Sequence, residues 1–324
     1  MRRVLLLLLL LPALAVAACG GDGGESGSAQ PADPPPPPKV DFPSGQGKTI
    51  RALRANLNEG AVFSPAMSVL RVGENRFAFA LFDTARAQIE PDAVAVYFSQ
   101  TNGRRLRGPF VARKESLRVD PRFMSRQTQA DLEGVQTFYV ADVKVPKAGR
   151  YTFTALAQID GQMVAASQIG MLAGAEGGPP DVGERAIRVH TETLEDVGGN
   201  LEQIDTRIPP AAELHRSDFA DVLGKKPVVL MFVTPQLCQS RVCGPVADVG
   251  LQVRADHPDV EFIHQEVWRD NDVQKGLRPP VAAWRLVTEP WTFVVGRDGR
   301  IVERFEGAVS VRELDAAVDK LEAS

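Results

Sequence analysis

The sequence predicts two folded parts of different class, an all-β sandwich over residues 48–172 and an α/β part over residues 211–324. In the first part, short β-prone runs alternate with turn signals, and no helical pattern of comparable length appears. From Leu214 onward, buried strand patterns alternate with helical patterns. The length of 324 residues exceeds one typical domain, and a connector over residues 173–210, rich in Gly and Pro, separates the two parts.

Residues 1–18 have the features of a signal peptide. A basic start (Met1–Arg3) precedes an apolar run (Val4–Leu11), and a small-residue site (Val16–Ala18) follows. The apolar stretch is shorter than the roughly 20 residues that span a bilayer. With Cys19 directly behind it, the site resembles the bacterial lipobox, in which the cysteine is diacylated and becomes the mature N-terminus. The resemblance implies lipidation of Cys19 and anchoring on the extracytoplasmic face of the cell membrane; the alternative is a plain secretory leader.

Residues 19–47 predict a flexible tether, because they are rich in Gly and Ser and then in Pro. Such a segment holds the folded part away from the membrane. The net charge of −4 and the lack of basic blocks argue against nucleic acid as a partner.

Five β-prone runs define the first part. They are Arg76–Phe82, Val94–Ser99, Phe138–Val145, Arg150–Ile159 and Gln162–Ile169.

The run Pro146–Phe153 resembles the corner of immunoglobulin-like domains, where a tyrosine shortly after a glycine precedes a core strand. Here Tyr151 follows Gly149. A disulfide-bearing member of that family would have cysteine where this chain has Phe153. The resemblance therefore implies an immunoglobulin-like sandwich that relies on packing alone.

Helices and strands alternate in the second part. We expect a helix over Ser217–Leu223 capped by Ser217, strands over Val228–Val233 and Val260–Glu266, an amphipathic helix over Val246–Asp256, a helical turn over Val281–Leu286, a hairpin of Trp291–Val295 and Arg300–Phe305, and a helix over Ser310–Leu321.

Cys238 and Cys243 lie between the first of these strands and Gly244-Pro245, which marks a helix start. The N-terminus of a helix favours a thiolate, the species that attacks disulfides, and Arg241 could add to this effect. Residues five apart in a helix are separated by roughly 8–9 Å, whereas a disulfide needs Cα atoms within about 7 Å. If the two cysteines pair, Gln239–Val242 must therefore form a short loop.

This order of elements resembles the thioredoxin fold over residues 211–324. The resemblance rests on the strand ending in Phe232, the cysteine pair, Thr288-Glu289-Pro290 before a strand, Asp298-Gly299 in the hairpin and Gly307 before the last helix. It implies a sheet flanked by helices, a surface dithiol, and a cis-proline, Pro290, facing it. Glu289, directly before that proline, would offer backbone hydrogen bonds to an extended substrate chain.

The chain also departs from the thioredoxin pattern. Four residues separate its cysteines where most thioredoxins have two, and Cys243-Gly244-Pro245-Val246 is similar to Cys-Gly-Pro-Cys without the second cysteine. Order along the chain favours Cys238 as the attacking thiol, whereas proximity to Gly-Pro favours Cys243.

The function predicted first is a thiol–disulfide oxidoreductase that needs no cofactor or metal. It would act through Cys238 and Cys243 on the thiols or disulfides of extracytoplasmic client proteins. One alternative is a non-catalytic scaffold in which the disulfide is structural. A second is a copper-binding protein, because the cysteine segment also resembles the Sco family; that family needs a histidine before the hairpin, and this chain has none after His264.

The histidines give no spacing typical of zinc ligands, since six residues separate His257 from His264. We expect His190 and His215 to face solvent and His264 to be structural. The three tryptophans are expected to pack in or near the core, and Glu289 either tunes the dithiol or is solvated.

Overall fold

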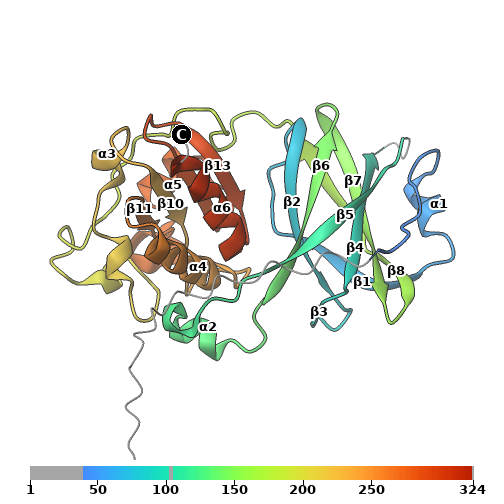
Figure 1. Cartoon of the computed structure of the whole chain (residues 1–324), viewed down its shortest axis with the longest axis horizontal. Helices are drawn as coiled ribbons and strands as arrows, with labels where there is room; N and C mark the ends of the chain where they lie inside the picture. Colours follow the sequence, from blue (N-terminus) through green and yellow to red (C-terminus); the bar gives the residue numbers. More distant parts are fainter. Residues whose placement is uncertain (1–38, 102–104, 323–324) are drawn as a thin grey trace, which may run out of the picture. The chain divides into compact units, whose positions relative to one another are not determined.

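The computed structural model of the chain describes residues 39–101 and 105–322, which belong to one compact unit (Figure 1). The predicted signal peptide, Cys19 and the tether up to residue 38 lie outside the described residues. In the described part of the chain, no helix has both the length and the apolar character to cross a membrane.

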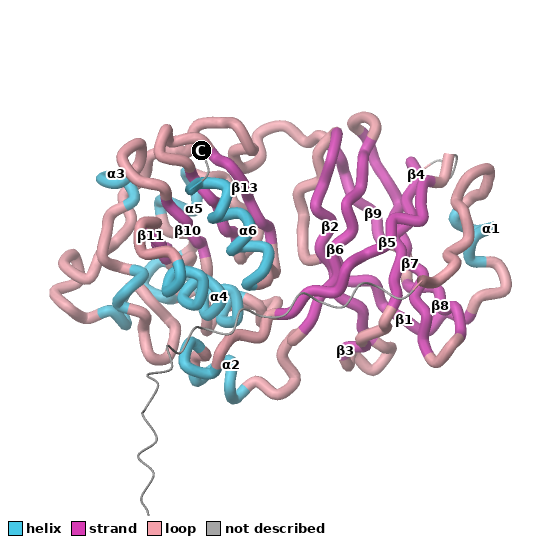
Figure 2. The backbone as a smooth tube through the Cα atoms, in the orientation of Figure 1, coloured by secondary structure: helices cyan, strands magenta, loops and turns pink. Residues whose placement is uncertain are grey.

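The first half, here called the β module, is built from strands, as predicted (Figure 2). Its elements are α1 (Ile50–Arg54), β1 (Asn58–Pro65), β2 (Gly73–Phe82), β3 (Gln88–Ile89), β4 (Ala93–Gln100), β5 (Arg107–Ser116), η1 (Pro121–Phe123), α2 (Arg126–Ala130), β6 (Thr137–Val145), β7 (Gly149–Ile159), β8 (Gln162–Ala166) and β9 (Ile169–Ala173).

Hydrogen bonding in the β module runs around a closed, barrel-like sheet. The order is β1-β8-β7-β4-β5-β6-β2, and β1 also pairs with β2. Two strands turn the corners. The first half of β5 pairs with β4 and its end pairs with β6, while β1 pairs first with β8 and then with β2. Strands that switch partners in this way join packed layers.

Aromatic side chains fill the β module. Phe77 and Phe153 stack with ring centroids 4.8 Å apart, and Phe98 stacks on Phe153 at 4.9 Å. Phe153 is fully buried, in agreement with a core that relies on packing. The Tyr151 hydroxyl donates to the Lys147 carbonyl at 2.9 Å and fixes the turn before β7.

The second half, the α/β module, follows the connector. Its elements are η2 (Leu201–Gln203), η3 (Ala212–Leu214), α3 (Phe219–Val222), β10 (Val228–Phe232), α4 (Cys243–Asp256), β11 (Glu261–Gln265), η4 (Arg269–Asn271), η5 (Val273–Lys275), α5 (Pro279–Ala283), β12 (Trp291–Val295), β13 (Ile301–Glu306) and α6 (Val311–Glu322).

A four-stranded sheet of order β11-β10-β12-β13 organises this module. β10 pairs parallel with β11 and antiparallel with β12, which pairs antiparallel with β13. Because side chains alternate along a strand, Val229 and Met231 of β10 pack toward α4 and α6. Leu230 and Phe232 pack on the opposite side with Trp284.

The observed ends of several elements differ from the expected ones. α4 begins at Cys243 and not at Val246, and Asp218 rather than Ser217 caps α3, accepting from the Ala220 N–H. The run Gln162–Ile169 divides between β8 and β9, and β1 and β5 were not predicted.

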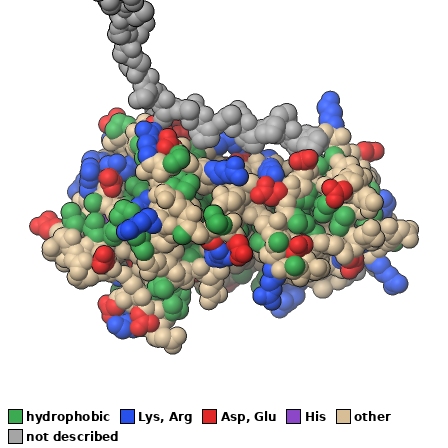
Figure 3. Space-filling view, turned by 90° about the horizontal axis from the view of Figure 1, so that it is seen from below, with side chains coloured by type: hydrophobic (Ala, Val, Ile, Leu, Met, Phe, Trp, Pro, Cys, Tyr) green, Lys and Arg blue, Asp and Glu red, His purple; other side chains and the backbone are tan. Residues whose placement is uncertain are grey.

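One apolar cluster joins the two modules. It contains Ala78 and Phe138 of the β module together with Val246 of α4 and Leu314 of α6. On the face seen in Figure 3, basic and acidic side chains are interspersed.

Candidate functional site: the cysteine loop

Residues 234–242, here called the cysteine loop, connect β10 to α4. Cys238 and Cys243 form a disulfide with Cα atoms 6.0 Å apart. Cys243 is the first residue of α4, and Cys238 lies in the loop before it. The residues between them form a turn in which Arg241 has a φ of +61° and donates its N–H to the Cys238 carbonyl at 3.3 Å. The prediction that Gln239–Val242 form a short loop and not a regular helix is confirmed.

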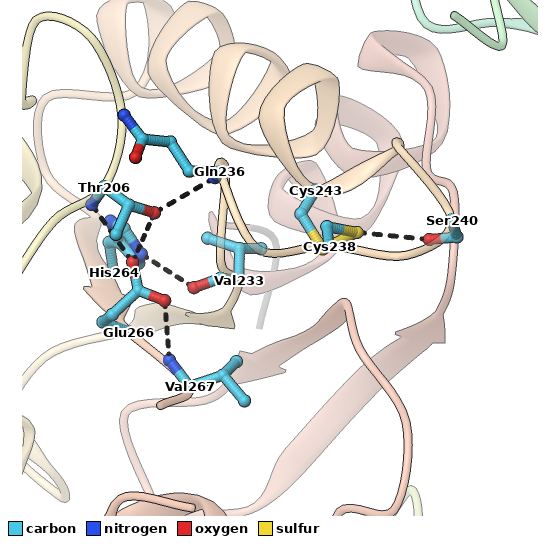
Figure 4. The surroundings of a disulfide bond; sticks show 9 residues. All are labelled: Thr206, Val233, Gln236, Cys238, Ser240, Cys243, His264, Glu266 and Val267. Atoms are coloured by element: carbon cyan, nitrogen blue, oxygen red, sulfur yellow. Dashed lines mark hydrogen bonds between the residues drawn. A yellow bond between two sulfur atoms is a disulfide. The ribbon is translucent and has the colours of Figure 1, made fainter. Parts of the chain in front are cut away.

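The two sulfur atoms differ in access to solvent. Cys243 is fully buried, whereas Cys238 is partly exposed. Cys238 lines a cavity of about 400 Å³ together with Thr128, Gln236 and Pro245. The Ser240 hydroxyl lies 3.2 Å from Cys238 Sγ (Figure 4). A molecule that approaches the disulfide from this cavity therefore meets Cys238 first.

The side chain of Arg241 is not free to support a thiolate. Its guanidinium forms a two-point ion pair with Asp131, and one of its nitrogens, Nε, donates at 2.8 Å. Asp131 belongs to residues 120–136, here called the α2 segment, between β5 and β6. The predicted effect of Arg241 on the thiols is thus weakened by a carboxylate of the β module.

The α2 segment also binds the first turns of α4. Ser125 donates its N–H, and Thr128 its hydroxyl, to the Asp248 carboxylate at 3.0 and 2.7 Å. Arg207 pairs with the other oxygen of Asp248 at 2.9 Å. Burial raises the pKa of Asp248 above its ordinary range, although these donors favour the ionised form.

Glu289 lies against the cysteine loop from the other side. Its carboxylate accepts a hydrogen bond from the backbone of Gln239, and burial raises its pKa above the ordinary value of 4.5. Glu289 also lines a second cavity, of about 450 Å³, together with Gln239 and Val242. The carboxylate is therefore half-buried beside the loop, not fully solvated.

Pro290 follows a cis peptide bond, as predicted. The residue is buried, and its carbonyl accepts the Gly307 N–H at 2.9 Å. Pro290 thus lies between Glu289 and the start of β12 at Trp291.

A buried cluster lies behind the cysteine loop and was not predicted. Asp205 Oδ2 is 3.3 Å from His215 Nε2, and Asp205 Oδ1 is 3.5 Å from His264 Nδ1. The expectation that His215 faces solvent is wrong, because its ring is 1% exposed and packs 5.0 Å from the ring of His264. Local spacing could not reveal a cluster whose members come from three separate segments. His190, by contrast, is exposed as expected.

The charges of this cluster are strongly coupled. Burial alone would raise the pKa of Asp205, but the two imidazole rings outweigh it and hold that pKa below its usual range. Burial lowers the pKa of His215. For His264, burial acts in the same direction, but Asp205 and Glu266 outweigh it and raise its pKa. The carboxylates therefore favour a positive charge on the His264 ring, whereas burial disfavours one on the His215 ring.

Hydrogen bonds of Thr206, the residue after Asp205, connect this region to the cysteine loop (Figure 4). The Glu266 carboxylate accepts from the Thr206 hydroxyl at 2.8 Å and from the Val267 N–H at 3.0 Å. The Thr206 hydroxyl oxygen in turn accepts the Gln236 N–H at 3.2 Å. Thr206, fixed by Glu266, thus anchors the cysteine loop at Gln236.

The tryptophans pack as expected. Trp284 and Trp291 are buried, and Trp268 is partly buried against the same cluster.

Comparison with known proteins yields little. No family model and no curated protein matches the chain. Among solved structures, a thiol:disulfide interchange protein of the thioredoxin family from Chlorobium tepidum TLS is similar over 45% of this chain and 99% of its own, with a TM-score of 0.29 and 14% identity. A likeness at this level does not by itself assign an activity.

Proposed function

We propose that the α/β module is a thioredoxin-like domain and that the chain is a thiol–disulfide oxidoreductase. The strand order β11-β10-β12-β13, with α4 directly after β10, supports the fold. One observation carries the activity: the Cys238–Cys243 disulfide stands at the start of α4 with one sulfur accessible and the other buried.

This asymmetry assigns roles to the two thiols. A client thiolate attacks Sγ of Cys238, the sulfur–sulfur bond to Cys243 breaks, and Cys243 leaves as a thiolate. The partial positive charge at the N-terminus of α4 stabilises that thiolate. A second client thiolate then attacks the client sulfur of the mixed disulfide and releases Cys238. Two electrons pass from the client to the pair, and the two protons of the client thiols end on the two cysteines or in solvent.

The reverse reaction uses the same atoms. The Cys238 thiolate attacks a client disulfide, and Cys243 then attacks Sγ of Cys238, which releases the reduced client and restores the disulfide. Glu289, beside the loop, is a candidate for contact with the client, and the backbone before Pro290 is the candidate edge for an extended client segment.

The location and partners of the protein are part of the proposal. Lipidation at Cys19 would anchor the chain on the extracytoplasmic face of the membrane, and its partners would be client proteins there, with no nucleic acid. The β module would be an immunoglobulin-like sandwich, which the Tyr151–Lys147 hydrogen bond and the partner switches of β1 and β5 support.

Thiol trapping in cells tests the proposed function. Cys243→Ser leaves Cys238 free, so client proteins should accumulate as mixed disulfides. Cys238→Ser leaves only the buried thiol and should trap far less, and the double variant is the control. Capture by Cys238→Ser alone would reverse the roles, and capture by neither variant would contradict the activity.

A structural disulfide is the second candidate, and one observation favours it. The Arg241–Asp131 ion pair ties the cysteine loop to the β module and limits its movement. Copper binding has less support. In the loop before the hairpin, the side chain that lies beside the cysteine loop is the carboxylate of Glu289 and not an imidazole.

A further inference from the structure

We propose that Asp205, His215 and His264 bind a divalent transition metal ion of the zinc class, in a buried site behind the cysteine loop. The ligand atoms of the three residues all lie within 4.8 Å of one another. They come from the connector, from the segment after η3 and from β11, so an ion would join three parts of the chain.

Two distances in the cluster match the separation of ligand atoms around one metal ion. A buried charge-assisted N–H···O bond is about 2.7–2.9 Å long. The separations of 3.3 Å between Asp205 and His215 and 3.5 Å between Asp205 and His264 are longer. Two ligand atoms around a tetrahedral zinc ion, each about 2.0–2.1 Å from it, are about 3.3–3.5 Å apart.

Hydrogen bonds orient the ligand atoms of His264 and Asp205. His264 Nε2 lies 3.0 Å from the Val233 carbonyl, so this nitrogen carries the proton and Nδ1 offers a lone pair toward Asp205. His264 Nδ1 has no hydrogen-bond partner among the described residues. Each Asp205 oxygen accepts one backbone N–H, from Arg207 at 2.8 Å and from Ala211 at 2.7 Å, which leaves its second lone pair available.

The site also holds two buried carboxylates, and a protonated His264 can balance only one of them. Asp205 and Glu266 are both 1% exposed, and no lysine or arginine in the described chain forms an ion pair with either carboxylate. Buried carboxylates need a compensating charge. A divalent ion bound by two neutral imidazoles balances both.

The donor set indicates the class of metal and its role. Two imidazoles and a carboxylate suit zinc, and one oxygen of the carboxylate lies beside each imidazole. All three residues are buried, so the site is closed and structural. The ion would fix the end of β10 through Val233, and Thr206, next to Asp205, holds the cysteine loop through Gln236.

Metal titration tests this proposal independently of the redox activity. The full chain, purified oxidised in detergent and without a histidine tag, is stripped with a chelator and titrated with Zn²⁺. Closing the disulfide keeps the thiols out of coordination. We expect about one equivalent of zinc by elemental analysis and a rise in the thermal unfolding midpoint.

Asp205→Asn and His264→Gln should bind at least about 100-fold more weakly. His190→Gln, an exposed histidine, should bind as the natural chain does.

Co²⁺ added to the unaltered chain gives a readout that does not depend on whether the variants fold. A ligand field of two imidazoles and a carboxylate should produce visible d–d absorption that one equivalent of Zn²⁺ abolishes. The proposal is overturned if the unaltered chain takes up no stoichiometric zinc and shows no cobalt spectrum, or if folded Asp205→Asn and His264→Gln bind zinc as tightly as it does.

Discussion

At the scale of single residues, the two cysteines have different environments although they form one bond. Cys243 has no exposed surface and sits at the first position of α4, whereas Cys238 borders a cavity. Thiol exchange depends on which sulfur can be reached and which leaves as the more stable thiolate. Both criteria favour attack at Cys238 and departure of Cys243.

Glu289 gives a prediction about pH. Its folded pKa lies above the unfolded value because burial disfavours the charged form. The folded state therefore binds more protons, and the contribution of Glu289 to stability falls as pH rises from the unfolded pKa through the folded one. Glu289→Gln, which keeps an acceptor for Gln239, should be at least as stable as the natural chain at pH 7.

Urea unfolding at a series of pH values measures this effect. The two midpoints should converge in acid, where Glu289 is protonated in both states. Glu195→Gln, at an exposed position, is the control and should leave the profile unchanged. A Glu289→Gln chain that loses stability at pH 7 but not in acid would disprove the assignment.

At the scale of elements, α4 is unusual because most of its length is buried on all sides. The sequence predicts an amphipathic helix, but every residue from Cys243 to Val253 is buried. The sheet covers one side, and the α2 segment reaches across another. A helix covered all round needs partners for its polar residues. Asp248 and Gln252 find them in the Ser125 and Asp120 N–H groups.

The ion pair beneath α4 gives a second prediction. Arg207→Ala leaves Asp248 buried without its cation and should lower the free energy of unfolding by about 3–5 kcal/mol. Lys320→Ala, which breaks an exposed pair with Glu303, should cost less than about 1 kcal/mol. Denaturant unfolding measures the free energy of unfolding of both variants. Equal losses would show that the buried pair stabilises the fold no more than the exposed pair does.

The sequence predicted individual strands and helices better than the contacts between segments that are distant in the chain. The apolar run of β10, the hairpin of β12 and β13 and the loop between the cysteines follow from local patterns. β1 and β5 escaped prediction because each contains Gly and Pro and buries only some of its residues. The Asp205–His215–His264 cluster could not be predicted, because only tertiary folding brings its three segments together.

At the scale of the whole molecule, the two modules share contacts that composition does not suggest. Arg76 of β2 pairs with Glu313 of α6 at 2.7 Å, and Glu306 of β13 accepts from the Ser68 hydroxyl at 2.6 Å. Arginines outweigh burial and hold the pKa of Glu313 below its usual range. We expect the modules to unfold together.

Gly307 tests this junction. It has a φ of +76°, and a Cβ there would meet the Ala66 carbonyl of the β module directly. Gly276 has a nearly equal φ of +77° and open space around it. Gly276→Ala should cost about 1–3 kcal/mol, because a φ of +77° with a ψ of −173° is a backbone conformation that is almost restricted to glycine. Gly307→Ala should cost clearly more, because the carbonyl must also move.

Thermal unfolding of both variants provides the comparison. Equal losses of stability would mean that the approach of Ala66 to Gly307 is not a tight contact. A Gly307→Ala chain that unfolds in two steps would show that the junction couples the modules.

The reduction potential of the Cys238–Cys243 pair tests the central proposal most directly. The purified chain is equilibrated with defined ratios of oxidised and reduced dithiothreitol or glutathione, and the fraction of free thiol is measured by alkylation and mass spectrometry. A disulfide that exchanges with clients should have a potential above about −300 mV. A potential well below that value would identify a structural link and contradict the proposed oxidoreductase.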